Sequence, residues 1–140
     1  MIIGKSKKEI EKMRASGKLA GEVLSHLRSL VQPGITTIEI DQVAEKMIRD
    51  AGALPTFKGY NGFPYSICAS VNEQVVHGFP SGYKLKDGDI FSIDCGVTLG
   101  GFVGDTATTV PVGTVDEQRS KLIRITEECL RGGRERNPDQ

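Results

Sequence analysis

Residues 90–112 read IFSIDCGVTLGGFVGDTATTVPV, and this stretch decides the fold. Two strand-like runs, at 90–99 and 102–112, flank Gly100 and Gly101. A pair of glycines between two runs rich in Val, Ile, Phe and Thr is typical of a tight β-hairpin turn, because such turns need positive φ angles. The sequence therefore predicts a long antiparallel hairpin.

The hairpin predicts that two aspartates share one face of the sheet. Counting back from a two-residue turn, Gly96 lies opposite Asp105 and Ala107 lies opposite Asp94. Asp94 and Asp105 are then diagonal neighbours with Cα atoms about 7–8 Å apart. Gly96 has no side chain, so we expect nothing opposite Asp105 to fill the space between the carboxylates.

Two carboxylates at that spacing repel each other unless a proton or a cation lies between them. A divalent metal ion with oxygen ligands is one interpretation of the pair. The alternative is two unrelated surface aspartates near a turn. A three-residue loop would place Asp94 and Asp105 on opposite faces and exclude the metal interpretation.

Helix-start patterns predict three helices beside the hairpin. They are the capping boxes SKKE and TTIE and the sequence TVDE, at residues 6–9, 36–39 and 114–117. Small and apolar residues recur every three or four positions after each start. We expect the helices to end at Pro33, at Gly52 and at Gly132-Gly133.

These elements predict an α+β fold in one domain, with an antiparallel sheet covered by two or three helices. Residues 65–71 and 74–76 are expected to add two short strands around a turn at Asn72-Glu73. The domain is expected to cover residues 1–133, and the polar residues 134–140 are expected to form a disordered tail.

Composition excludes several classes of partner. Lys and Arg together number 18, as do Asp and Glu, so net charge gives no reason to expect nucleic acid or a membrane surface. The amino-terminal sequence lacks the apolar run of a signal peptide. The three cysteines, Cys68, Cys95 and Cys129, form no Cys-x-x-Cys pair, which predicts free thiols and a cytoplasmic location.

A histidine and a group of aromatic residues are further site candidates. His77 is expected at a strand end before Gly78, where it could handle protons or could bond a backbone carbonyl. His26 falls off the apolar stripe of the first helix and is expected to be exposed. Near Phe57, a small apolar pocket or a satellite core cluster is predicted from Tyr60, Phe63 and Cys68.

Taken together, three motifs resemble the signature of type I methionine aminopeptidases. They are FKGYNGFP, ICASVNE and VHGFP, at residues 57–64, 67–73 and 76–80. GDI followed by Asp94, and GDT containing Asp105, resemble the family's first two metal ligands, eleven residues apart. The resemblance runs from about residue 2 to residue 130. It implies half of a pita-bread fold, in which two α+β halves related by a pseudo-twofold axis enclose the active site.

The resemblance also implies roles for individual residues. Asp94 and Asp105 would bind divalent metal ions of the cobalt, manganese, iron or zinc class. His77 would contact the substrate and stabilise the scissile amide as it becomes tetrahedral. Tyr60, Phe63 and Cys68 would line the pocket for the methionine side chain. The substrate would be the amino terminus of a nascent protein that starts with methionine.

One part of the family pattern has no match in these 140 residues. The family also uses a histidine and two glutamates from its second half, with a second substrate-contacting histidine, and no histidine follows His77. We therefore expect a truncated chain with weak metal binding and little or no activity alone. The alternatives are a non-catalytic binding module, which could self-associate as a homodimer, and an enzyme completed by another chain.

Overall fold

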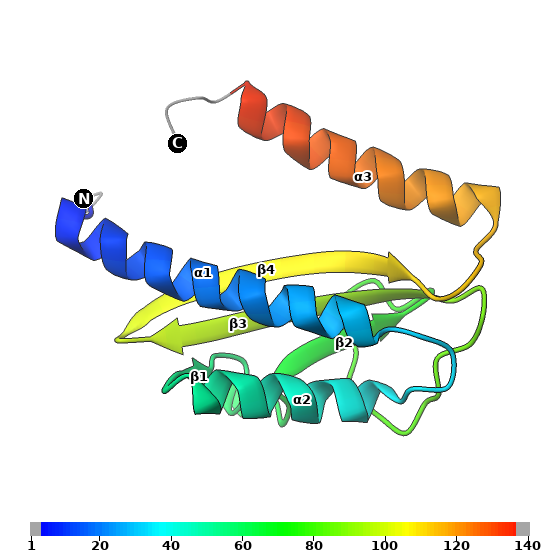
Figure 1. Cartoon of the computed structure of the whole chain (residues 1–140), viewed down its shortest axis with the longest axis horizontal. Helices are drawn as coiled ribbons and strands as arrows, with labels where there is room; N and C mark the ends of the chain where they lie inside the picture. Colours follow the sequence, from blue (N-terminus) through cyan, green and yellow to red (C-terminus); the bar gives the residue numbers. More distant parts are fainter. Residues whose placement is uncertain (1–3, 137–140) are drawn as a thin grey trace.

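The computed structural model describes residues 4–136 as three α-helices, a short 3-10 turn and four strands (Figure 1). In chain order these are α1 Lys7–Leu30, α2 Thr37–Asp50, β1 Leu54–Pro55, η1 Tyr60–Gly62, β2 Ile67–Val71, β3 Ile90–Leu99, β4 Phe102–Pro111 and α3 Glu117–Glu135. The α+β class and the antiparallel sheet are confirmed.

Strand β3 is the centre of the sheet. It pairs along its whole length with β4, and on its other side with β2 and with the two-residue strand β1. Gly100 and Gly101 form the hairpin turn with φ angles of 58° and 83°, a left-handed conformation that glycine adopts without strain. The register pairs Gly96 with Asp105 and Ala107 with Asp94, so the predicted hairpin is confirmed.

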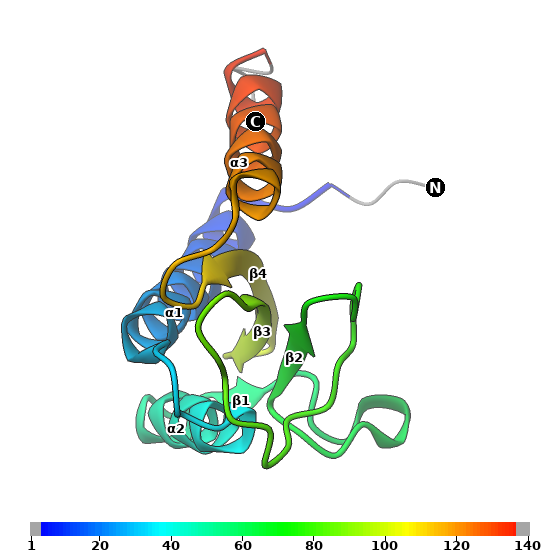
Figure 2. The same cartoon turned by 90° about the vertical axis from the view of Figure 1, so that its right-hand side faces the viewer.

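One face of the sheet is buried under α1 and α2 (Figure 2). Alternate residues of β3 point into this core, and they are Phe91, Ile93, Cys95 and Val97. Helix α1 approaches β4 so closely at Gly104 that a side chain there would meet the backbone of Ser16. The backbone contact explains why a glycine interrupts a strand of larger residues.

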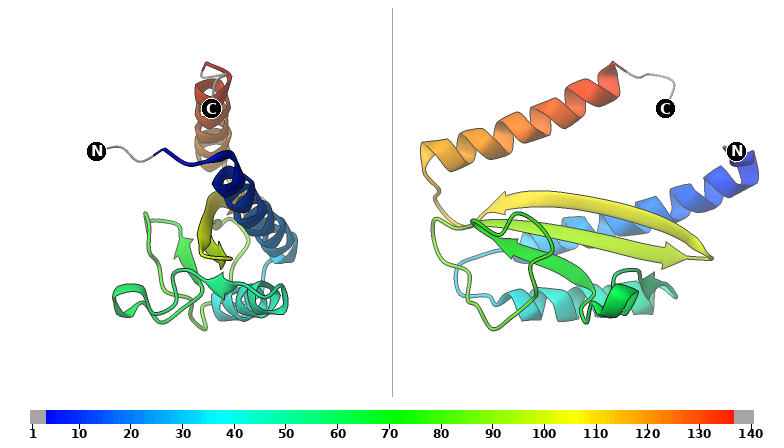
Figure 3. Two further views of the ribbon diagram at one scale, coloured as in Figure 1. Left: turned by 90° about the vertical axis from the view of Figure 1, so that its left-hand side faces the viewer. Right: turned by 180° about the vertical axis from the view of Figure 1, so that it is seen from behind.

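The opposite face of the sheet has no helix packed directly on it (Figure 3, right). Helix α3 projects away from the rest of the domain beside β4, and none of its residues is buried (Figure 2). Its apolar side chains Leu122, Ile125 and Leu130 are between 40% and 66% exposed. The expectation of two or three covering helices is therefore met by two.

The three predicted helix starts are confirmed. Ser6 with Glu9, and Thr36 with Glu39, form reciprocal capping boxes. The third helix is capped by Asp116, whose carboxylate accepts the N–H of Arg119 at 2.8 Å. Thr114 lies two residues before this cap, and its backbone N–H donates to the Asp87 carboxylate.

The end of the third helix was predicted wrongly. Helix α3 continues through Gly132-Gly133 to Glu135, because glycine weakens a helix without removing its backbone hydrogen bonds. The disordered tail expected at 134–140 stays a prediction, since residues 137–140 lie outside the described part of the chain. The short strand β1 was not predicted, since two residues carry no periodicity.

The second of the two short strands is also absent. Residues 74–76 form no strand, and Val75 and Val76 are 85% and 63% exposed. Gln74 instead closes a turn, donating its N–H to the carbonyl of Val71 and accepting the N–H of Val71 through its side chain. Over residues 4–136, no helix combines the length and the apolar content needed to cross a membrane.

Candidate metal and substrate site

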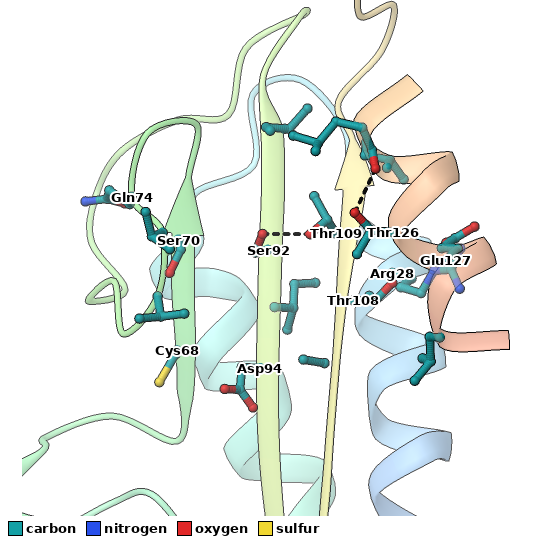
Figure 4. A pocket seen from close by; sticks show the side chains of 18 of the residues that line it. Arg28, Cys68, Ser70, Gln74, Ser92, Asp94, Thr108, Thr109, Thr126 and Glu127 are labelled. Atoms are coloured by element: carbon teal, nitrogen blue, oxygen red, sulfur yellow. Dashed lines mark hydrogen bonds between the residues drawn. The ribbon is translucent and has the colours of Figure 1, made fainter. Parts of the chain in front are cut away.

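The open face of the sheet carries small polar side chains from three strands (Figure 4). Cys68 lies beside Asp94, and Ser70 beside Ser92. The Ser92 and Thr109 hydroxyls are 2.8 Å apart. Together with α3, which contributes Leu122, Ile123, Thr126 and Leu130, this face borders a groove of about 1280 Å³. Figure 4 shows Thr126 and Glu127 of α3 across this groove from β3.

Asp94 and Asp105 lie on this face as the sequence predicts, as diagonal neighbours on β3 and β4. Burial, the charge of Asp105 and a hydrogen bond with Asp105 raise the pKa of Asp94 to about 6, while the charge of His77 acts in the opposite direction. Protonation of Asp94 relieves the repulsion between the two neighbouring carboxylates. A bound cation would relieve it in the same way.

The expectation that the space beside Gly96 stays unfilled is wrong. The Thr56 N–H donates to the Gly96 carbonyl at 2.9 Å, and this bond carries Phe57 over β3. A Cβ atom at position 96 would lie 2.6 Å from Cε1 of the Phe57 ring. The glycine therefore makes room for an aromatic ring beside the two carboxylates.

Cys68 lies on the groove as a neutral thiol. Its side chain is buried, and burial, followed by the charges of Asp94 and Asp105, raises the pKa of the Cys68 thiol to about 11. A protonated thiol packs as a small apolar group and is a poor nucleophile. The geometry therefore favours a pocket wall at this position. The three cysteines are free thiols, as predicted.

His77 also lines the groove, but it does not follow a strand. It lies in a loop with a φ angle of 56°, and its charge acts on Asp94. The predicted strand end is wrong because residues 74–76 turn back on β2 through Gln74. His26, on α1, is exposed as expected.

The aromatic candidates separate into two places. Tyr60 is 71% exposed in η1 and does not line the groove. Phe63 packs edge-on against Tyr65 and Phe79, with ring centroids 6.1 Å and 5.2 Å away. Tyr65 and Phe79 were not among the predicted site residues. Their closeness in sequence to Phe63 and His77 was the signal that could have indicated them.

The donor set on this face fits part of a metal site. Carboxylate oxygens suit divalent cations, and two neighbouring carboxyls whose joint ionisation is unfavourable attract positive charge. Asp94 and Asp105 supply two such ligands. Among residues 4–136, no three His, Cys, Asp or Glu side chains gather closely enough to hold a metal ion.

The two neighbouring carboxyls on the open face of this α+β fold can supply oxygen ligands to a divalent cation. The sequence profile of Metallopeptidase family M24 matches residues 11–136, and the chain belongs to this family. Within the family, the resemblance to type I methionine aminopeptidases and to half of their pita-bread fold is confirmed by sequence and structure comparisons.

Three known proteins illustrate the similarity. The methionine aminopeptidase of Clostridium perfringens is 57% identical over 136 residues, which cover 97% of this chain and 55% of that protein. Methionine aminopeptidase 1 of Bacillus subtilis is 50% identical, with 95% and 54% covered. The crystal structure of methionine aminopeptidase from Thermotoga maritima superposes with a TM-score of 0.90 at 41% identity, covering 94% of this chain and 53% of that one. The chain thus spans about half the length of the curated relatives it matches.

Proposed function

We propose that this chain supplies the amino-terminal half of a methionine aminopeptidase site. The observation that supports the proposal most strongly is that Asp94, Asp105 and Cys68 share the open face of the sheet, with His77 in a loop beside the same groove. These are the residues that the family resemblance assigns to the metal ions, the methionine pocket and the substrate amide. The family's metal dependence supports divalent ions as cofactors.

Each residue has a chemical task in this proposal. Asp94 and Asp105 would supply carboxylate oxygens to a cation, and the bound cation would favour the ionised form of Asp94. When bound, divalent ions in such a site polarise the scissile carbonyl and activate a water molecule at neutral pH. His77 donates a hydrogen bond to the amide as it becomes tetrahedral.

The methionine side chain is placed by the pocket residues. The neutral thiol of Cys68 and the ring of Phe63 supply apolar walls, and Tyr60 closes the pocket from the η1 turn. Because Tyr60 is exposed here, its contribution requires the turn to close over a bound peptide. The substrate is the amino terminus of a nascent chain in the cytoplasm, and the metal belongs to the cobalt, manganese, iron or zinc class.

We further propose that the 140 residues alone have little or no turnover. A histidine and two glutamates of the family's ligand set have no counterpart after Asp105. Water would have to fill most coordination positions, and metal ions held by two carboxylates lack a fixed geometry. Removal of single catalytic groups commonly costs orders of magnitude in rate.

Methionine release from a Met-Ala-Ser peptide with cobalt or manganese tests this proposal. We expect release by the chain to be at or near background, and any release above it to be lost in Asp94→Asn and kept in Ser92→Ala, which alters the same face without a carboxylate. Metal-dependent turnover comparable with that of a complete relative would contradict the proposed low activity. Turnover that survives Asp94→Asn would contradict the assigned site.

The second candidate is a non-catalytic binding module that pairs with its own copy. The exposed apolar residues of α3 and the uncovered sheet face favour it, because apolar patches of this kind mark interaction sites. A twofold homodimer would imitate the pseudo-symmetry of the pita-bread fold. Two copies of Asp94, Asp105 and His77 would then share one cleft.

Analytical ultracentrifugation at micromolar concentration distinguishes these assemblies. A dimer that dissociates in Leu122→Ser supports self-association, whereas a single monomeric species at all concentrations contradicts it. The third possibility is an enzyme completed by another chain. It predicts that turnover appears only when the second half of a relative is added in stoichiometric amount.

A further inference from the structure

The loop that carries His77 is attached to the outer edge of β2. Strand β2 pairs with β3 on one side only, so the backbone N–H groups on its other edge need different partners. The Ile67 N–H donates to the Asp41 carboxylate, the Ala69 N–H to the Gly78 carbonyl, and the Val71 N–H to the Gln74 side chain. Two of these three bonds come from the loop on either side of His77.

Gly78 is the tightest point of this attachment. Its N–H donates to the Ser70 hydroxyl at 3.0 Å, and its carbonyl accepts the Ala69 N–H at 2.8 Å. A side chain at position 78 would meet the carbonyl of Ala69. His77, one residue earlier, has a left-handed φ of 56°, which a non-glycine residue keeps only when its surroundings hold it there.

Phe79 attaches the other side of the loop to the pocket. Its ring packs edge-on against Phe63 and Tyr65, with centroids 5.2 Å and 5.6 Å away, although 57% of the residue remains exposed. Edge-to-face pairs of this kind add stability beyond the area that they bury. The loop and the aromatic pocket residue Phe63 are therefore joined by direct ring contact.

We infer that Ser70 and Phe79 are positioning residues for His77. Ser70 holds the Gly78 N–H against β2, Phe79 ties the loop to Phe63, and His77 between them is kept at the groove beside Cys68 and Asp94. Neither residue touches reacting atoms. The inference rests on the proposed function for the catalytic use of His77, but the positioning itself exists without substrate or metal.

NMR of the full metal-free chain tests this inference, because the chain has only two histidines. His26 lies exposed on α1 and serves as an internal reference. In Ser70→Ala, we expect the Gly78 amide to exchange with solvent about tenfold faster, since its buried donor loses its acceptor. The chemical shifts of the His77 imidazole should move towards those of a histidine in a flexible loop, while those of His26 stay unchanged.

Three further variants separate positioning from general loss of structure. Phe79→Ala removes an exposed ring and should shift the His77 signals without unfolding the chain, and Phe79→Tyr should restore them. Ser92→Ala removes the hydroxyl next to Ser70, which bonds Thr109 and not the loop, and should leave His77 unchanged.

The inference is overturned if the His77 signals are the same in wild type, Ser70→Ala and Phe79→Ala. If Ser70→Ala does not fold, the comparison of Phe79→Ala with Phe79→Tyr decides the outcome alone. The NMR measurements do not depend on turnover, so they remain valid for an inactive chain. The presence or absence of turnover bears only on the proposed function.

Discussion

The two faces of β3 differ in chemistry although their residues alternate along one strand. Ile93 is fully buried under the helices, and Asp94, the next residue, lies on the open face with a raised pKa. The helix-covered face holds the fold together by apolar burial. The open face keeps the neighbouring carboxyl pair, at a cost to stability that the core offsets. Loss of apolar volume on the covered face should therefore lower stability, and loss of a carboxyl on the open face should weaken cation binding.

Ile93→Ala is expected to have the largest effect on stability. Removing a buried isoleucine leaves a cavity in the core and should lower the free energy of unfolding by about 3 kcal/mol. Urea denaturation followed by circular dichroism measures this loss. Ser92→Ala, the preceding residue on the open face, is the matched control and should change the unfolding free energy far less. Equal losses in both variants would contradict the division between the faces.

Gly96→Ala tests the close approach of the Phe57 ring to β3 at Gly96. The new methyl group would overlap the Phe57 ring, and overpacking of this kind costs about 2 kcal/mol. Gly101→Asn, at a positive φ in the hairpin turn with open space around it, is a mild control. If Gly96→Ala melts at the same temperature as the wild type, the Phe57 ring does not pack against β3 at Gly96.

Asp94→Asn should stabilise the metal-free chain at neutral pH. The pKa of Asp94 is raised from 3.8 to about 6, so folding favours its protonated form. The corresponding stability is present below pH 4 and is lost as the pH rises through 6. The shift corresponds to roughly 3 kcal/mol, which solvent screening of a half-exposed carboxyl reduces to about 1 kcal/mol.

Thermal melts of wild type and Asp94→Asn between pH 4 and 8 provide the measurement. The difference between the two proteins should grow with pH across this window, because only wild type carries the ionised Asp94. Glu9 and Glu39 have lowered pKa values and are common to both proteins, so their contributions cancel. A difference that is constant with pH would mean that Asp94 titrates normally.

The sequence was most informative where contacts are local. The hairpin and the shared face of Asp94 and Asp105 follow from the parity of residues on either side of Gly100-Gly101. Both capping boxes at the first two helices lie within four residues, and both were predicted correctly.

Prediction was wrong where hydrogen bonds between a loop and a strand decide the local structure. Residues 74–76 have strand-like composition, but Gln74 and Gly78 use their hydrogen bonds to cover the edge of β2. The position of Phe57 over Gly96 depends on a bond between Thr56 and β3, forty residues further along the chain. No periodicity within either segment carries this information.

Helix α3 was predicted correctly as a helix, but its exposure could not be predicted. Its amphipathic pattern predicted a helix correctly, but the pattern cannot specify which surface the apolar stripe covers. Helix α1 buries Ala20, Val23 and Leu24 against the sheet, whereas α3 buries none of its residues. The same kind of sequence signal therefore yields a core element in one case and an exposed surface in the other.

Calorimetric titration of the metal-free chain with cobalt or manganese at pH 6 is the most direct test of the paired-carboxylate site. We expect weak binding with release of protons, because a bound cation favours ionisation of the Asp94 that is still protonated at pH 6. Binding should be lost in Asp94→Asn and in Asp105→Asn, and retained in Ser92→Ala. Binding that is unchanged in both aspartate variants, or that releases no proton, would contradict the assignment of these carboxylates as metal ligands.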